Sequence, residues 1–185
     1  MIFISAGHNI GSQKTKEDPG AVNKQKIKEN SITIEFRDLV CKELDKKGLK
    51  YIKDENDEKL SDYLKRIKTG SGSVVLEFHC DSSSNEQATG TTGLIGDDSD
   101  RLDALFSKEI NDCFSETLGL KNRGVIKESQ SHRGRLGLMR EQGIVSLQEM
   151  FFLSNPNDLK SYHENKYILA EKTANIIEKY ENIIK

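Results

Sequence analysis

The sequence predicts an α/β fold in which a mostly parallel sheet is covered by helices on both faces. Short apolar runs rich in β-branched residues alternate with longer segments whose apolar residues recur at helical spacing, and this alternation is typical of such sheets. The chain has 185 residues, enough for one domain with a substantial core. No internal repeat, linker or low-complexity tract divides it, so residues 1–185 are expected to form a single domain.

The stretch from Ser73 to Asp81 organises this prediction. Its run Val74–Phe78 is short, apolar and bounded by polar, turn-forming residues, so we expect a strand buried on both faces that ends at His79. A first strand is expected at Ile2–Ile4, and His8 follows it after a turn of small residues. Ligands of open α/β sheets bind at the carboxyl ends of the strands, so the two histidines mark a candidate site.

The remaining elements follow from periodicity and turn signals. Residues 14–28 are expected to form a polar loop with a turn at Asp18-Pro-Gly-Ala21. Further strands are expected at 50–53, 89–96, 123–126 and 144–149, the last ending in Glu149. Helices are expected from about residue 29 to a stop at Gly48, and at 58–68, 98–118 and 157–180.

The composition argues against several classes of function. Basic and acidic side chains number 28 and 30 and are well mixed, so we expect no broad attraction to nucleic acid or to an anionic membrane. Cys41, Cys80 and Cys113 lie far apart, which favours a reducing compartment over a disulfide framework. The segment Met1–Ala6 lacks a basic leader, so no secretory signal is expected, and no stretch is long enough to span a membrane.

Two histidines and two acidic residues carry the candidate chemistry: His8, His79, Glu29 and Glu149. Two histidines and one carboxylate make a catalytic zinc shell with a fourth position left for water, whose pKa zinc lowers to about 7. A further carboxylate outside that shell can accept the proton of the water and pass it to a leaving amine. The alternative is that both histidines are partly buried and hydrogen-bonded without a metal.

The order of short motifs along the chain resembles that of the zinc-dependent N-acetylmuramoyl-L-alanine amidases, the Amidase_3 type of cell-wall amidase found in autolysins and phage endolysins. The matching segments run in family order from about residue 2 to the last helix: Ala6-Gly-His8, Asp18–Ala21, Glu29 at a helix start, Val75–His79 followed by Gly90, Asn122–Val125, Leu136–Arg140 and Val145–Asn155.

The resemblance implies a site and a reaction. His8, Glu29 and His79 would bind Zn²⁺, and Glu149 would act first as general base and then as general acid. The implied substrate is peptidoglycan or a muropeptide, cleaved at the amide between the N-acetylmuramic acid lactyl group and L-alanine of the stem peptide. The implied fold is a twisted sheet of about six strands flanked by helices.

The sequence departs from the family pattern at three places that bear on substrate range. Asp81 stands two residues after the second histidine, where the family usually has Asn. The strand Thr91-Thr-Gly-Leu-Ile95 lacks the Glu that is common there, and the connection Glu128–Arg135 is longer than usual.

Several other residues compete for roles at this site. Glu35 is a rival to Glu29, although it lies further into the helix and nearer its solvated flank. Glu77 could orient a ligand histidine or simply make an ion pair. Cys80 is expected in the core, because adjacent strand residues point to opposite faces. His132 could face the cleft but fits a solvated loop better, and His163 is expected at the surface.

The basic residues fall into two groups, arginines that could bind substrate and lysines of a polar loop. Arg123 and Arg140 could bind a carboxylate of the stem peptide, or they could form internal salt bridges. A run of lysines in the loop is expected to be a solvated face: Lys14, Lys16, Lys24, Lys26 and Lys28.

Three functions stay open at this point. The first is a compact phage endolysin or phage-encoded relative, made in the bacterial cytoplasm without a signal peptide and reaching the wall after membrane lysis. The second is a zinc peptidase that cuts within the stem peptide. The third is a non-catalytic wall-binding module on the same fold, against which the intact Glu149 argues because a binder has no use for a base. Oligomeric state is not predictable from these residues.

Overall fold

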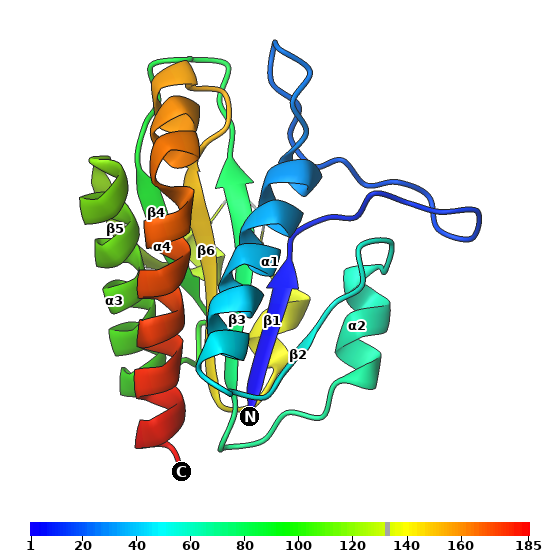
Figure 1. Cartoon of the computed structure of the whole chain (residues 1–185), viewed down its shortest axis with the longest axis vertical. Coiled ribbons are helices and arrows are strands. Elements are labelled where there is room, and N and C mark those ends of the chain that lie inside the picture. Colours follow the sequence, from blue (N-terminus) through cyan, green and yellow to red (C-terminus); the bar gives the residue numbers. More distant parts are fainter. Residues whose placement is uncertain (132–133) are drawn as a thin grey trace.

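A six-stranded sheet forms the centre of the protein, in the order β2-β1-β3-β6-β4-β5 (Figure 1). The computed structural model describes residues 1–131 and 134–185. Four of the five strand pairings are parallel and only β4 with β6 is antiparallel, so the expected mostly parallel sheet is confirmed. The strands are β1 (Ile2–Ala6), β2 (Tyr51–Lys53), β3 (Val74–Asp81), β4 (Thr91–Ile95), β5 (Asn122–Lys127) and β6 (Ile144–Phe152).

Helices cover both faces of the sheet unequally. The three long helices α1 (Glu29–Lys46), α3 (Arg101–Leu118) and α4 (Pro156–Ile183) pack on one face, and the short α2 (Leu60–Arg66) packs on the other with the 3₁₀ turn Gly137–Arg140 (Figure 1). Each face therefore has its own apolar core, a large one under the long helices and a small one under α2. No helix in the described part of the chain combines the length and apolarity needed to cross a bilayer.

Alternation along β3 sorts its side chains between these two cores. Phe78 and Cys80 belong to the large core, which confirms Cys80 as a core residue, whereas Val75 belongs to the small one. Glu77 and His79 follow Val75 at two-residue spacing and so point to the same face. That face is apolar near the start of the strand and polar near its carboxyl end.

Several elements differ in length from the prediction: β1 continues to Ala6, α3 begins at Arg101 rather than residue 98, and two further strands and two further helices differ as follows. β3 and β6 do not end at His79 and Glu149 but continue to Asp81 and Phe152, because Met150 to Phe152 are buried and extend the ladder. α4 begins one residue early, with proline at its first position, and runs on to Ile183. α2 begins at Leu60 rather than residue 58, because the Glu58 side chain accepts hydrogen bonds from Glu55 N and Arg66 instead.

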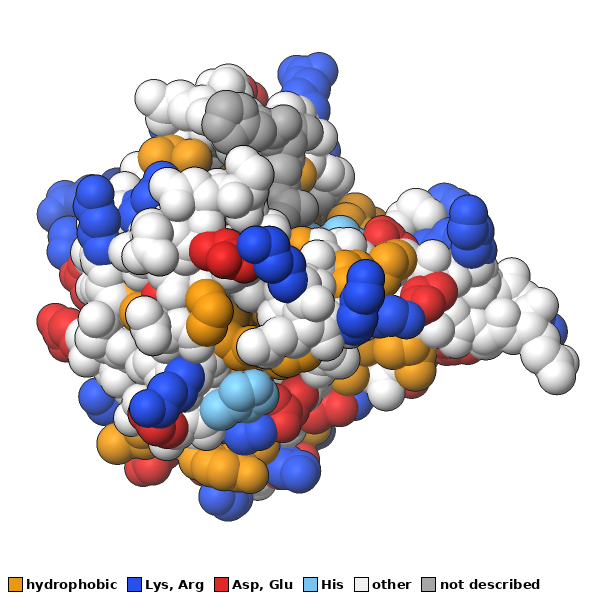
Figure 2. Space-filling model, turned by 90° about the horizontal axis from the view of Figure 1, so that it is seen from above, with side chains coloured by type: hydrophobic (Ala, Val, Ile, Leu, Met, Phe, Trp, Pro, Cys, Tyr) orange, Lys and Arg blue, Asp and Glu red, His pale blue; other side chains and the backbone are white. Residues whose placement is uncertain are grey.

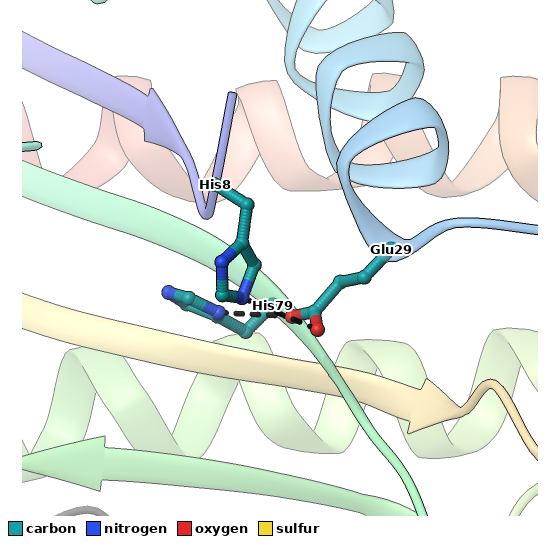
Figure 3. A group of neighbouring side chains, drawn as sticks. All are labelled: His8, Glu29 and His79. Carbon is teal, nitrogen blue, oxygen red and sulfur yellow. Dashed lines mark hydrogen bonds and ion pairs between the residues drawn. The ribbon is translucent and has the colours of Figure 1, made fainter. Parts of the chain in front are cut away.

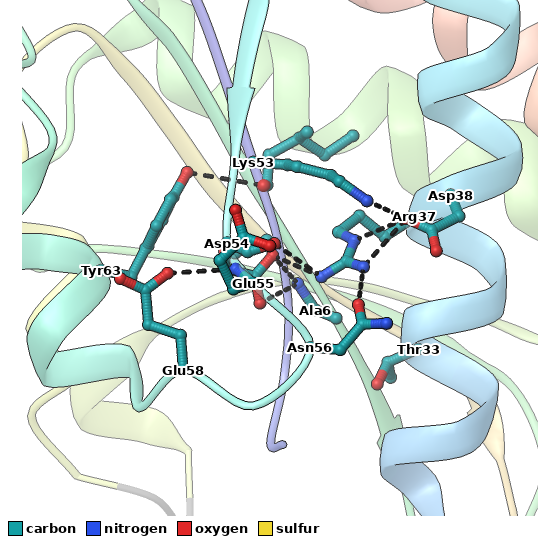
Figure 4. A network of polar contacts seen from close by, with 12 residues as sticks. Ala6, Thr33, Arg37, Asp38, Lys53, Asp54, Glu55, Asn56, Glu58 and Tyr63 are labelled. Carbon is teal, nitrogen blue, oxygen red and sulfur yellow. Dashed lines mark hydrogen bonds and ion pairs between the residues drawn. The ribbon is translucent and has the colours of Figure 1, made fainter. Parts of the chain in front are cut away.

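A buried arginine ties α1 to the ends of β1 and β2 (Figure 4). The Arg37 side chain is fully buried, and its Nη1 donates to Asp54 Oδ1 at 2.8 Å and to the Asp54 carbonyl at 3.1 Å. Asp54 also accepts from the backbone N–H of Ala6 at 3.1 Å, and Arg37 makes a further contact with Asn56. Ala6 is the last residue of β1 and lies two residues before His8. The Arg37–Asp54 pair therefore fixes the point at which the chain leaves the sheet towards His8.

We expect Arg37→Met to lower the free energy of unfolding by about 3–5 kcal/mol, because it leaves the buried Asp54 carboxylate without its cation. The measurement is urea denaturation followed by circular dichroism. Arg66→Met is the matched control: Arg66 is exposed at the surface, so loss of its pair with Glu58 should cost about 1 kcal/mol or less. Equal losses in the two variants would contradict the structural role of Arg37.

Candidate metal centre and active site

Three side chains from distant parts of the sequence meet at the carboxyl end of the sheet (Figure 3). His8 follows β1, Glu29 is the first residue of α1, and His79 lies near the end of β3. The Glu29 carboxylate lies between the two rings, with Oε1 2.9 Å from His79 Nδ1 and Oε2 3.2 Å from His8 Nε2. One potential ligand atom from each of the three residues lies within 4.8 Å of the other two.

His8 adopts a backbone conformation that residues other than glycine rarely adopt. Its φ is 73°, in the left-handed region, which costs on the order of 1 kcal/mol and persists only when neighbours enforce it. The residues on both sides of His8 are held by hydrogen bonds. Gly7 N donates to the Phe78 carbonyl at 2.7 Å, the Thr33 hydroxyl donates to the Gly7 carbonyl at 2.8 Å, and Asn9 N donates to the Asp18 carbonyl at 3.1 Å. Strain held in place in this way is common at functional sites.

Two glycines leave the space that the three side chains occupy. A Cβ on Gly7 would lie 2.2 Å from the His79 ring, and a Cβ on Gly20 would lie 2.4 Å from the His8 ring and 2.5 Å from Glu29. All three distances are shorter than real Cβ contacts, so any larger residue at either position would displace the cluster. The Asp18-Pro-Gly-Ala21 turn is thus part of the site.

Glu29 is a buried carboxylate surrounded by donors. Besides the two rings, it accepts hydrogen bonds from the backbone N–H groups of Cys80 at 2.9 Å and Ala21 at 2.8 Å. Burial alone would raise its pKa, but the hydrogen bonds and charges of His79 and His8 outweigh that effect and hold the pKa of Glu29 well below its usual range. Its position at the start of α1 favours the ionised form too.

Each histidine has a carboxylate on the ring nitrogen that faces away from Glu29. His79 Nε2 lies 3.1 Å from Glu77, which accepts a second hydrogen bond from the Ser5 hydroxyl at 2.8 Å. Burial lowers the pKa of His79, but Glu29 and Glu77 together raise it to about 10. His8 Nδ1 lies 2.9 Å from Asp18. Of the two roles considered for Glu77, the contacts favour orientation of the histidine.

The donor set fits a zinc ion. Carboxylates hold His8 Nδ1 and His79 Nε2, which leaves His8 Nε2 and His79 Nδ1 turned towards Glu29. His8 Nε2 is buried, and its contact with Glu29 Oε2 at 3.2 Å lacks the geometry of a good hydrogen bond. Two imidazole nitrogens and one carboxylate oxygen, each backed by a hydrogen-bonded partner, are the ligands of catalytic zinc sites.

Glu149 lies on the neighbouring strand at the same level as His79. The two residues are register partners in the parallel pairing of β3 with β6, so their side chains leave the same face of the sheet. Glu149 is 3% exposed and also faces Thr92 across the antiparallel pairing with β4. Its carbonyl accepts a hydrogen bond from the Thr91 hydroxyl at 3.0 Å, which fixes the strand locally.

Two grooves open on either side of this centre. One, of about 620 Å³, is lined by His8, Asp18 and His79 together with Leu60 and Leu136. The other, of about 610 Å³, is lined by Glu149 together with residues of β4, β5 and the loops beside them. His8 and His79 therefore line one groove, and Glu149 lines the other.

The rival residues lie elsewhere. Glu35 accepts a hydrogen bond from the Tyr162 hydroxyl at 2.9 Å and also pairs with Lys166, so it joins α1 to α4 instead of reaching the metal cluster. His163 is exposed, as expected. Arg140 pairs with the buried Glu128, which gives it the structural role. His132 lies outside the described residues.

Acidic and basic side chains both occur on the face of the molecule that carries the site (Figure 2). In the long loop before α1, Lys14, Lys16, Lys24 and Lys26 are exposed, as expected for a solvated face, whereas Lys28 is half-buried and pairs with Glu17 at 2.8 Å. Lys24 pairs with Glu86.

Sequence reasoning missed Asp18, Gly20 and Ser5 as parts of the site. Asp18 and Gly20 lie in a predicted turn that is also a family-matching segment, but neither was given a role, because their contacts exist only once the loop folds back over His8. Ser5 is an ordinary small strand residue until its partner Glu77 is placed beside it. The signal that could have indicated Ser5 is a polar residue in the otherwise apolar strand β1, opposite the equally unusual Glu77 in β3.

Solved structures of amidases share this fold. A protein of Neisseria meningitidis assigned to the N-acetylmuramoyl-L-alanine amidases is 26% identical with a TM-score of 0.75, over 96% of this chain and 93% of that one. The N-acetylmuramoyl-L-alanine amidase of Clostridium difficile 630 is 17% identical with a TM-score of 0.78, over 98% and 96%. The catalytic domain of an endolysin targeting Clostridia difficile is 18% identical with a TM-score of 0.71, over 96% of each chain.

The family comparison agrees with the fold. The Amidase_3 profile, described as N-acetylmuramoyl-L-alanine amidase, matches residues 2–179. A comparison with curated proteins finds none that matches the chain. Because the family match spans nearly the whole sequence, the chain belongs to the Amidase_3 family and is an N-acetylmuramoyl-L-alanine amidase, an enzyme of a family that is generally zinc-dependent.

Proposed function

We propose that this amidase is a zinc hydrolase whose metal is held by His8, Glu29 and His79 and whose general base is Glu149. The observation that carries the proposal is the cluster of two imidazoles and one carboxylate, which lies level with a buried glutamate on the adjacent strand. Zinc bound there would supply Lewis-acid activation of water and of the substrate carbonyl. The family match supports the substrate, the amide that joins N-acetylmuramic acid to L-alanine.

Glu149 carries the proton through the reaction. It accepts a proton from water as the water oxygen bonds to the lactyl carbonyl carbon, and it then donates that proton to the L-alanine nitrogen as the C–N bond breaks. The products are a lactyl carboxylate on the sugar and a stem peptide with a free amino terminus. The low exposure of Glu149 keeps bulk water away from this proton.

Glu77 and Asp18 act through the ligand histidines. By accepting from His79 Nε2 and His8 Nδ1, they fix the orientation of each ring and leave the other nitrogen for the metal. Ser5 and Gly20 hold these two carboxylates in place, because the Ser5 hydroxyl donates to Glu77 and Gly20 N donates to Asp18.

We expect Glu29→Ala to reduce bound zinc from about one equivalent to near zero, because one of three ligands is lost. Glu149→Ala should keep its zinc but lose turnover by about 10²- to 10⁴-fold, the usual contribution of a general base. The measurements are elemental analysis of the purified protein and mass spectrometry of peptides released from muropeptides.

Glu35→Ala is the matched control, since Glu35 lies on the same helix but contacts Tyr162 and Lys166; it should keep both zinc and turnover. Normal cleavage by Glu149→Ala, or a wild type without zinc, would contradict the assignment. Peptides without an L-alanine terminus would favour a zinc peptidase, and binding without turnover would favour a wall-binding module.

We expect Glu77→Gln to weaken zinc binding about tenfold, because the amide keeps the shape of the side chain but removes the charge that polarises His79. The measurement is competition with a chelator, which needs no turnover. Glu58→Gln is the control: Glu58 lines the same groove but pairs with Arg66, so its variant should bind zinc normally. Unchanged affinity in Glu77→Gln would exclude the positioning role.

The same proposal extends to the biological role, a lysis enzyme of the endolysin type made in a bacterial cytoplasm. The similarity to an endolysin catalytic domain supports this role. Bacteria expressing the protein should remain intact until their membrane is permeabilised, and turbidity after addition of a permeabilising agent is the measurement. Clearance of intact cells from inside without any partner would contradict delivery by membrane lysis.

A further inference from the structure

The groove that contains Glu149 has an arginine built into its wall. It is lined by Glu149 and Phe152 of β6, Thr92 and Leu94 of β4, and Arg123 of β5. Arg37, Arg66 and Arg140 all pair with carboxylates of the protein. No ion pair among the described residues joins Arg123 to a carboxylate, although it lines the groove where the reaction takes place.

Three local features hold Arg123 in this position. The register between β4 and β5 shifts so that an extra residue of β5 is inserted beside Arg123, and Gly124 takes a φ of 85° there. Bulges of this kind re-aim a side chain near active sites. The guanidinium carbon lies 5.1 Å from the centre of the Phe152 ring, and the arginine stem lies across Gly90, where a Cβ would be 2.9 Å from its Cγ.

The direction of the substrate follows from the proton that Glu149 delivers, and this step rests on the proposed function. The leaving group is the amino group of L-alanine, so the peptide must lie on the side of the scissile bond that Glu149 faces. The stem peptide therefore occupies the groove of Glu149 and Arg123, and the muramic acid lies towards the groove beside His8.

The distance between Glu149 and Arg123 matches the reach from the scissile bond to the residue that follows L-alanine in the stem peptide. Arg123 and Glu149 lie on strands separated by β4, so their backbones are about 10 Å apart at the usual strand spacing. An extended dipeptide spans about 7 Å, and the arginine side chain covers the remainder. We propose that Arg123 binds the free α-carboxylate of the second stem residue, so that the enzyme prefers stems with that carboxylate over amidated stems.

The test compares two substrates that differ only at that group: N-acetylmuramoyl-L-alanyl-D-isoglutamate and its isoglutamine counterpart. The wild type should have about tenfold higher kcat/KM for the carboxylate substrate, the scale of a charge-assisted hydrogen bond at a partly exposed site. In Arg123→Met this ratio should fall to about one, and in Arg123→Lys, which lacks the planar fork, to an intermediate value. Arg101→Met, an exposed arginine on α3, should keep the wild-type ratio.

Calorimetry with the product dipeptides separates this inference from the proposed function. L-Alanyl-D-isoglutamate should bind the zinc-loaded wild type more tightly than L-alanyl-D-isoglutamine, and Arg123→Met should remove the difference. A wild type that hydrolyses neither muropeptide but discriminates between the dipeptides would contradict the amidase proposal and retain Arg123 as the carboxylate site. Equal kinetics and equal binding of both members of each pair would overturn the role of Arg123.

Discussion

The buried carboxylate of Glu29 is the interaction on which the rest of the site depends. A buried charge is tolerated only where several donors replace water, and Glu29 has backbone donors from Ala21 and Cys80 as well as the two rings. Those donors come from the loop before α1 and from β3, so one carboxylate joins a helix start, a turn and a strand end. Gly20 is required for the same reason, because only a residue without Cβ fits against Glu29 and His8.

The sheet supports this cluster by separating apolar from polar residues along a single face. Val75, Glu77 and His79 point in one direction, so the small core beneath α2 passes directly into the metal centre without a change of face. Glu149 lies beside His79 on the same face because β6 pairs with β3 in parallel register. A shift of one residue would turn Glu149 to the opposite face, into the core under α3 and α4.

Much of the fold could be predicted because its signals are local. Apolar periodicity is sufficient for the long helices, and short β-branched runs indicate most of the strands. His8, His79, Glu29 and Glu149 were candidates because of their places at strand ends and at a helix start, whereas the role of each came from the resemblance to a family. The bond from Arg37 to Asp54 and the contact from Asp18 to His8 were not predictable, since they depend on how loops fold over the sheet.

The departures from the family pattern change the charge of the groove in opposite directions, because Asp81 adds a carboxylate to its lining whereas β4 contributes none. Thr92 and Leu94 stand in the strand where a glutamate is common, and they present a hydroxyl and methyl groups to the groove beside Glu149. A second carboxylate opposite Glu149 would repel a negatively charged stem peptide at short range. With neutral residues on β4, recognition of the stem carboxylate falls to Arg123, a groove residue that the fold aligns through Gly90 and Phe152.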